Sequence, residues 1–225
     1  MKPLNEQHLA LLRRHMTEII DMHFDLAADE IGKNAPAAAL REALLKVPRH
    51  VFVPAQLAVA AYQDTPLPIG FDKTVSQPFI AALMLELLEL EPGQRVLEVG
   101  TGLGYQAALM AELGAKVFSV EVVEEFAAEA GVRLMAVGRM NVSIRVGDGS
   151  RGWAEHAPFD RILVTAAAPA PPAPLVEQLA VGGRMVIPLG GKEVQQLSVV
   201  AKGATGTTET REIMPVRFTQ LETGP

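Results

Sequence analysis

The chain has 225 residues, of which 49% are hydrophobic and 20% are charged, so it is too apolar for a disordered protein and long enough for one domain with a sizeable core. Its formal charge of −6 argues against nucleic acid or an anionic membrane as the main partner, because both attract a basic surface. The chain has no cysteine, no apolar run of about 18 residues and no signal-peptide pattern at its start, which predicts a soluble cytoplasmic protein without disulfides or thiolate metal sites.

The first part of the chain, up to residue 90, is expected to be mainly helical. Apolar residues recur at three- and four-residue steps over residues 6–31, which predicts an amphipathic helix, and a second short helix is expected at 37–46. Residues 47–54 should be extended, because proline disfavours a helix at the residue before it. Residues 62–77 should be irregular, and Pro78 predicts the start of an apolar helix over 79–90.

Strands and helices alternate from residue 91 onward. Strands are expected at 95–99, 116–120, 142–146, 161–165 and 184–188, and helices at 105–113, 123–137 and 175–179. This alternation predicts a mostly parallel sheet that is covered on both faces. Two β-rich runs, at 194–201 and 210–218, predict a terminal hairpin that joins the sheet antiparallel. We therefore expect an α/β fold with a seven-stranded, mostly parallel sheet.

A glycine-rich turn should join the first of these strands to its helix. Residues 96–105 read Val-Leu-Glu-Val-Gly-Thr-Gly-Leu-Gly-Tyr, so a strand meets the free N–H groups and positive dipole end of a helix. A dinucleotide fingerprint would need a glycine where Tyr105 stands. The observed spacing is instead that of methyltransferases that use S-adenosylmethionine (AdoMet), and a turn without a ligand is the alternative. The residues expected at the cofactor are Gly100, Thr101, Gly102 and Gly104.

Acidic residues follow the next two strands. Glu121 lies where a carboxylate can accept bonds from both ribose hydroxyls, and Asp148 could accept one from an adenine amino group, with Gly149 leaving room for the ring. The alternative for each acid, taken singly, is a helix or turn cap. Because the glycine turn and both acids follow successive strands, at the edge where open α/β sheets bind ligands, we predict one cofactor site there.

Further sequence blocks are more specific than the glycine turn. They read Val-Pro-Arg-His-Val-Phe-Val-Pro at 47–54, Leu-Pro-Ile-Gly at 67–70, Thr-Val-Ser-Gln-Pro at 74–78, Gly-Asp-Gly at 147–149, Val-Thr-Ala-Ala-Ala-Pro at 164–169, Gly-Gly-Arg at 182–184 and Pro-Val-Arg-Phe at 215–218. Together with the glycine turn, they make residues 47–218 resemble the protein-L-isoaspartate (D-aspartate) O-methyltransferase family. The blocks at 74–78 and 164–169 indicate this family in particular.

The resemblance implies a Rossmann-like, class I AdoMet-dependent methyltransferase fold and a role in protein repair. Such enzymes transfer a methyl group from AdoMet to the α-carboxylate of L-isoaspartyl residues, leaving S-adenosylhomocysteine as the product. The expected partners are isoaspartyl-containing proteins and peptides; the sequence does not decide whether D-aspartyl sites are accepted. A carboxylate is already ionised at pH 7 and needs no general base, so catalysis would consist mainly of positioning. The ester then closes to a succinimide, whose hydrolysis returns part of the chain to normal aspartate.

The resemblance also implies an acceptor site. Ser76 matches the family's active-site serine, whose hydroxyl would orient the acceptor carboxylate; the alternative is an N-cap of the helix that starts at Pro78. The loop after the fourth strand and the terminal strand would border a peptide groove, with an exposed strand charge as the alternative for Arg217. The predicted substrate-binding residues are Thr74, Ser76, Thr165, Ala166, Ala167 and Arg217, with Ser76 catalytic and no metal site.

Two regions depart from the commoner family form. Residues 71–73, Phe-Asp-Lys, place charges beside the expected substrate entrance. The N-terminal helix is longer than in a minimal member, and we expect it to pack on its own domain as part of a monomer or weak homodimer. Its histidines, His8, His15 and His23, are expected on the helix face or in solvent.

In this interpretation residues 1–225 form a single domain. Residues 1–90 make an N-terminal helical and substrate-side segment, and residues 91–225 make the AdoMet-binding α/β core with its hairpin. Two alternatives remain open: a carboxyl methyltransferase with a dedicated peptide substrate, and a non-catalytic module that holds AdoMet.

Overall fold

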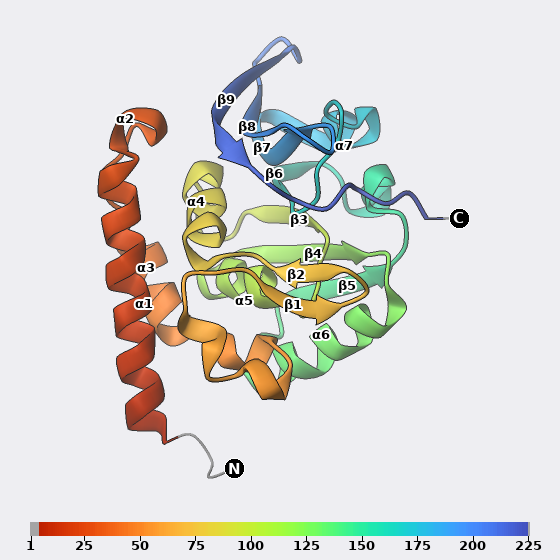
Figure 1. The fold of residues 1–225 in the computed structure, drawn as a ribbon. Coiled ribbons are helices and arrows are strands. Elements are labelled where there is room, and N and C mark those ends of the chain that lie inside the picture. The colour runs from red at the N-terminus through yellow and green to blue at the C-terminus, as the bar shows by residue number, and fades with distance from the viewer. Residues whose placement is uncertain (1–4, 225) are drawn as a thin grey trace.

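The structure is a computed structural model that describes residues 5–224 (Figure 1). Its seven-stranded sheet has the order β5-β4-β3-β6-β7-β8-β9 in this part of the chain. Strands β5, β4, β3, β6 and β7 are parallel, and β8 is antiparallel to both β7 and β9. The strands are β3 Arg95–Val99, β4 Lys116–Glu121, β5 Val142–Val146, β6 Phe159–Val164, β7 Leu179–Gly190, β8 Gln195–Lys202 and β9 Thr208–Val216. The predicted α/β fold, with its antiparallel terminal hairpin, is confirmed.

Helices lie on both faces of this sheet. Helices α4, α5 and α6 share one face, with α5 packed on β4, α6 on β4 and β5, and α4 on β6 and β7, and α7 packs against β7 on the other face. Helix α1 runs along the outside, against α3 and α4 (Figure 1). The helices are α1 Glu6–Leu26, α2 Ala28–Ile31, α3 Ala38–Lys46, α4 Pro78–Leu88, α5 Tyr105–Glu112, α6 Glu124–Ala136 and α7 Ala173–Gln178. None of the helices within residues 5–224 is long and apolar enough to cross a membrane.

The strands divide their side chains between two hydrophobic cores, because successive residues of a strand point to opposite faces. Val96 of β3 and Leu163 of β6 join the larger core, with α4, α5 and the N-terminal helices. Their neighbours Leu97 and Ile162 join the smaller core, which Leu175 of α7 covers. All four strand residues are fully buried, which explains why these strands are short continuous apolar runs.

Helix α1 packs on its own chain, as expected from its apolar stripe. Met16, Ile20 and Phe24 recur at four-residue steps and have no exposed surface. They belong to the same core as the α4 side chains. The oligomeric state stays a prediction.

The two segments between the N-terminal helices and α4 differ from the sequence predictions. Within residues 47–54, expected to be extended, Arg49–Phe52 form a 3-10 turn. Residues 62–77, expected to be irregular, contain a hairpin of β1 (Leu67–Gly70) and β2 (Lys73–Val75). Its turn places Phe71 and Asp72 at φ of 48° and 54°, a backbone region in which hairpin turns usually have glycine or asparagine. The sequence of this turn therefore did not indicate a hairpin.

Candidate active site

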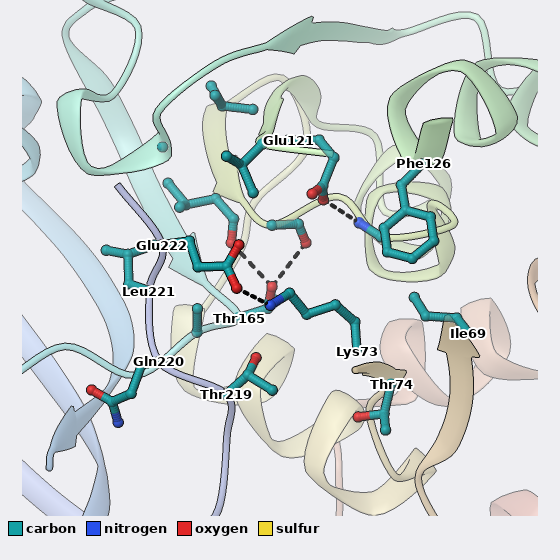
Figure 2. A pocket seen from close by; sticks show the side chains of 17 residues that line it. Ile69, Lys73, Thr74, Glu121, Phe126, Thr165, Thr219, Gln220, Leu221 and Glu222 are labelled. Atoms are coloured by element: carbon teal, nitrogen blue, oxygen red, sulfur yellow. Dashed lines mark hydrogen bonds and ion pairs between the residues drawn. The ribbon is translucent and has the colours of Figure 1, made fainter. Parts of the chain in front are cut away.

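An inner cavity lies at the carboxyl ends of β3, β4 and β6, and an outer groove adjoins it. The inner cavity, of about 90 Å³, is lined by the glycine turn, the residues after β4 and β6, the β1–β2 hairpin and the C-terminal segment (Figure 2). The outer groove, of about 1130 Å³, lies between the start of α4 and the end of β9. Lys73 and Thr74 of β2 line both. A ligand in the inner cavity would therefore adjoin a ligand in the outer groove.

The glycine turn packs directly against the loop after β6. Gly100 has φ of 93°, and a Cβ at this position would overlap Thr165 Oγ1. The Thr165 hydroxyl lies 2.8 Å from the Gly100 carbonyl oxygen and 3.0 Å from that of Val99, so it holds the turn in place. Gly100, Gly102, Thr165 and Ala166 all line the inner cavity. Only glycine at position 100 allows this close approach.

Glu121, at the end of β4, faces the inner cavity. One carboxylate oxygen accepts a bond from the N–H of Gly102 (2.8 Å) and the other from that of Val123 (3.0 Å). Burial raises the pKa of Glu121, while these N–H groups and the charge of Lys73 oppose the rise. Phe126 of α6 lines the same cavity (Figure 2). Glu121 thus combines a fixed carboxylate with apolar neighbours.

Asp148 and Gly149 follow β5, as predicted, but only Gly149 lines the inner cavity. One oxygen of Asp148 accepts bonds from the N–H (2.9 Å) and hydroxyl (2.7 Å) of Ser150, and the other lies 3.3 Å from Arg151 Nε. The cap that was the alternative for Asp148 is therefore present. A Cβ at Gly149 would overlap Val99. A bond from Asp148 to an adenine remains a prediction.

Two other residues that were expected at the cofactor support the turn from behind. Thr101 is buried, and its hydroxyl hydrogen bonds with that of Ser119 over 2.6 Å. Gly104 precedes α5 with φ of 95°, and a Cβ there would lie 3.3 Å from Leu134 of α6. Neither lines the inner cavity, so the structure does not bring them to the predicted ligand surface.

Glu98 lies below the turn, in β3, with no exposed surface. One oxygen accepts a bond from the Ser119 hydroxyl, and the other has no hydrogen-bond partner within residues 5–224. Burial raises the pKa of Glu98 to about 8. Glu98 is therefore mostly protonated at pH 7.

Ser76 lines the outer groove and is not the cap of α4. The helix begins at Pro78 with Gln77 at the N-cap position, and the N–H of Phe79 donates to Asp64 Oδ1 (2.9 Å). The Ser76 hydroxyl makes no hydrogen bond to any residue in the described range, although its carbonyl oxygen accepts one from Arg49 Nη2 (2.7 Å). The N-cap interpretation of Ser76 is wrong, because Asp64 from a distant segment binds the first turn.

The remaining predicted acceptor residues differ in what they can contact. Thr74 lines both cavities, and Arg217 lines the outer groove with an exposed side chain. Ala167 is buried; its N–H donates to the Thr219 carbonyl (2.8 Å), and its own carbonyl accepts from the Leu221 N–H (2.7 Å). The N–H and carbonyl of Ala167, a predicted substrate-binding residue, are therefore already paired with the C-terminal segment.

The C-terminal segment, residues 219–224, is a part of the site that the sequence analysis missed. It crosses the carboxyl ends of the strands (Figure 1), and its Glu222 forms an ion pair with Lys73 in the inner cavity (Figure 2). Gly224 lies against Val122 and Asp148. This short polar segment has no periodicity or motif, so no sequence signal could have found it.

Residues 71–73, which depart from the commoner family form, make the hairpin turn and the first residue of β2. Phe71 packs edge-on against Phe126, which lines the inner cavity, with ring centroids 5.4 Å apart. Lys73 lies at the junction of both cavities. The expectation of charges beside the site is met by Lys73 and Asp72, which lines the outer groove.

His23 of α1 also reaches the outer groove. Its Nε2 lies 3.0 Å from Asp64 Oδ2, and its ring stacks on Phe79 at 5.0 Å. His23 therefore lies on the face of α1 that passes the start of α4, with a side chain that is 35% exposed, which agrees with the expected helix-face position. No group of metal-ligating side chains occurs in the part of the chain that the structure describes.

A family model, curated relatives and two solved structures that resemble this chain carry closely similar descriptions. A family model described as "Protein-L-isoaspartate(D-aspartate) O-methyltransferase (PCMT)" matches residues 27–224. Protein-L-isoaspartate O-methyltransferase 1 of Polaromonas sp. is 49% identical over 97% of this chain and 93% of its own length. A solved protein-L-isoaspartate O-methyltransferase superposes with a TM-score of 0.79 at 28% identity, over 92% of this chain and 65% of that one. A Plasmodium falciparum structure of the same description, in complex with S-adenosyl-L-homocysteine, has a TM-score of 0.74 at 25% identity, over 83% and 91%.

Proposed function

The chain belongs to the protein-L-isoaspartate(D-aspartate) O-methyltransferase family, and on that premise we propose that it repairs damaged proteins by methylating the α-carboxylate of L-isoaspartyl residues with AdoMet as donor. The observation that carries the proposal is the junction of the two cavities. The inner cavity is lined by the glycine turn and Glu121, which suit the donor. The outer groove is lined by Ser76, whose hydroxyl has no hydrogen-bond partner within residues 5–224. Residues of β2 line both cavities. Donor and acceptor would meet there.

The inner cavity has the chemistry that the donor requires. When bound, AdoMet supplies an electrophilic methyl group on a sulfonium sulfur. Glu121 would accept bonds from the ribose hydroxyls with lone pairs that its backbone N–H partners leave free. Val122 and Phe126 would flank the adenine, and Gly100 and Gly149 leave room for close approach. Gly102 and Asp148 complete the proposed donor site, with Thr101 and Gly104 supporting the turn.

The outer groove would present the acceptor. The Ser76 hydroxyl donates to the isoaspartyl carboxylate and orients one oxygen toward the methyl group, with Thr74 beside it. Arg217 lies along the groove, where its charge can bind a peptide. Since the carboxylate is ionised at pH 7, the residues need only hold it in line and exclude water.

We extend the proposal to the organisation of the chain. Residues 1–90 would supply the acceptor side and residues 91–225 the donor-binding core of one domain. The packing of α1 on α3 and α4 supports a monomer or weak homodimer. The cytoplasm is the proposed location.

Methyl uptake should distinguish an isoaspartyl peptide from its aspartyl twin. The twin differs only in which carboxyl group is in the backbone, so general peptide binding cannot produce a difference. We expect ester formation, followed by mass spectrometry, on the isoaspartyl peptide alone. Equal rates on both peptides would overturn the repair assignment. Methylation of neither, with S-adenosylhomocysteine still bound, would favour a dedicated peptide acceptor or a non-catalytic module.

Donor binding should require the C-terminal segment to move. The inner cavity of about 90 Å³ is well below the roughly 300 Å³ of small-molecule sites, because Leu221 and Glu222 fill part of it. We expect Glu222→Gln to speed association of S-adenosylhomocysteine about two- to five-fold, the range for a partly exposed ion pair. Stopped-flow fluorescence measures the rate, and Glu209→Gln on exposed β9 is the matched control. An unchanged rate would show that the Lys73 pair does not restrain the segment.

A further inference from the structure

Arg49 is a fully buried cation, and its burial calls for an explanation other than stability. Its side chain has no exposed surface, and no carboxylate within residues 5–224 lies within ion-pair distance of it. Its Nη1 has no hydrogen-bond partner in the same range. A guanidinium stays protonated in proteins, and the cost of burying this one exceeds what the more distant charge of Asp64 returns, since the pKa of Arg49 is lowered by burial. Packing alone therefore does not explain Arg49.

The contacts of Arg49 lead to the acceptor site. Its Nε donates to the Ala61 carbonyl and its Nη2 to the Ser76 carbonyl, both over 2.7 Å. The guanidinium also lies over the ring of Tyr105, 4.7 Å from the centroid. The planar guanidinium of Arg49 thus links its own 3-10 turn to the backbone of Ala61 and of Ser76. Tyr105 of α5 supports it from one side.

A second buried charge holds the residues that follow Ser76. Asp64 accepts bonds from the Gln77 side chain (2.7 Å) and the Phe79 N–H (2.9 Å). Its side chain is 9% exposed, and it also pairs with His23. Within residues 76–79, Arg49 therefore binds Ser76, and Asp64 binds Gln77 and Phe79. The Ser76 hydroxyl has no partner within residues 5–224, and Ser76 lines the groove.

We propose that Arg49 is a positioning residue for methyl transfer, which fixes the place from which the Ser76 hydroxyl reaches the acceptor by holding the Ser76 carbonyl. The inference rests on the proposed function, in which that hydroxyl orients the acceptor carboxylate. The Ser76 carbonyl accepts one hydrogen bond from a guanidinium that the Ala61 carbonyl also holds, so the Ser76 peptide plane and Cβ stay in place. From a fixed Cβ, the hydroxyl can occupy only the few positions that its χ1 rotamers allow. Lysine would keep the charge but not the two-carbonyl fork.

A double-mutant cycle between Arg49 and Ser76 tests this role. We expect Arg49→Lys to lower kcat about 10-fold with an unchanged Kd for S-adenosylhomocysteine, because only the reacting geometry is altered. In a Ser76→Ala background, the same change should alter kcat less than about two-fold, since no hydroxyl remains to be positioned. Arg49→Gln, of similar length but neutral, is the second variant if the lysine form does not fold. Thermal unfolding monitors stability throughout.

The control is Val53→Ala, which removes a buried side chain from the same segment without touching Ser76. It should lower the unfolding temperature and leave kcat unchanged. Equal losses from Arg49→Lys in both backgrounds would overturn the proposal and make Arg49 a structural residue. So would an unaffected kcat in Ser76→Ala, because nothing would then need positioning. Wild-type discrimination between the isoaspartyl peptide and its twin reports the proposed function separately.

Discussion

Replacing Glu121 with alanine is expected to weaken binding of S-adenosylhomocysteine by roughly 100-fold. The carboxylate would accept two ribose hydroxyls, and two charge-assisted hydrogen bonds of about 1.5 kcal/mol each correspond to about that factor in Kd. Alanine also removes the acceptor of the Gly102 N–H (2.8 Å) and so loosens the glycine turn. Isothermal calorimetry measures Kd directly and does not depend on the acceptor.

Two further variants separate these effects. Glu121→Gln keeps an oxygen for the Gly102 N–H but cannot accept both hydroxyls, so its Kd should lie between wild type and alanine. Ser76→Ala should leave Kd unchanged, because Ser76 lines the outer groove and not the inner cavity. A change of less than about three-fold in Glu121→Ala, below the worth of one such bond, would remove Glu121 from the donor site.

Replacing Glu98 with glutamine is expected to abolish a large pH dependence of stability. Burial raises the pKa of Glu98 from 4.5 to about 8 in the folded chain. Between these values the folded chain holds a proton that the unfolded chain has released, so stability falls as the pH rises. The slope is at most about 1.4 kcal/mol per pH unit, and the total loss is a few kcal/mol. The contribution is complete below pH 4.5 and lost above about 8.

Urea unfolding at several values between pH 5 and 8 measures this difference. Glutamine is close in shape to the protonated acid and can still accept from Ser119, so Glu98→Gln should match wild type near pH 5 and exceed it near pH 8. Subtracting the two curves cancels the other titrating groups. Glu125→Gln, at an exposed position of α6, should run parallel to wild type. Parallel curves for Glu98→Gln would show that its carboxyl titrates normally.

The α/β core could be predicted closely because its signals are local. The bounds of β3 and β5 agree with prediction, and β4 and α5 each differ by one residue at one end. Short apolar runs separated by helical periods indicate buried parallel strands wherever they occur. Of the three residues predicted after β4 and β5, Glu121 and Gly149 line the inner cavity, since parallel strands end at one edge, and Asp148 does not line it.

The acceptor side could not be predicted to the same depth. The hairpin turn at Phe71 uses residues that rarely adopt positive φ, so its turn had no signature. The binding of α4 by Asp64 joins residues 15 positions apart, and the pairing of Ala167 with Thr219 joins residues much farther apart. Such contacts depend on where whole segments pack, which no window of sequence contains.

By itself, the sequence determined the succession of strands and helices in the α/β core, the glycine turn with its following acids, and the family. Each of these depends on residues that are neighbours along the chain. Only the tertiary structure decided which groups are available for chemistry. Asp64 binds the first turn of α4, which leaves the Ser76 hydroxyl without that role. The C-terminal segment pairs with the main chain of Ala167, and Arg49 is buried against the Ser76 carbonyl. The physical reason is that a hydrogen-bonding group is satisfied by whatever the packed chain brings within about 3 Å of it, regardless of its distance in sequence.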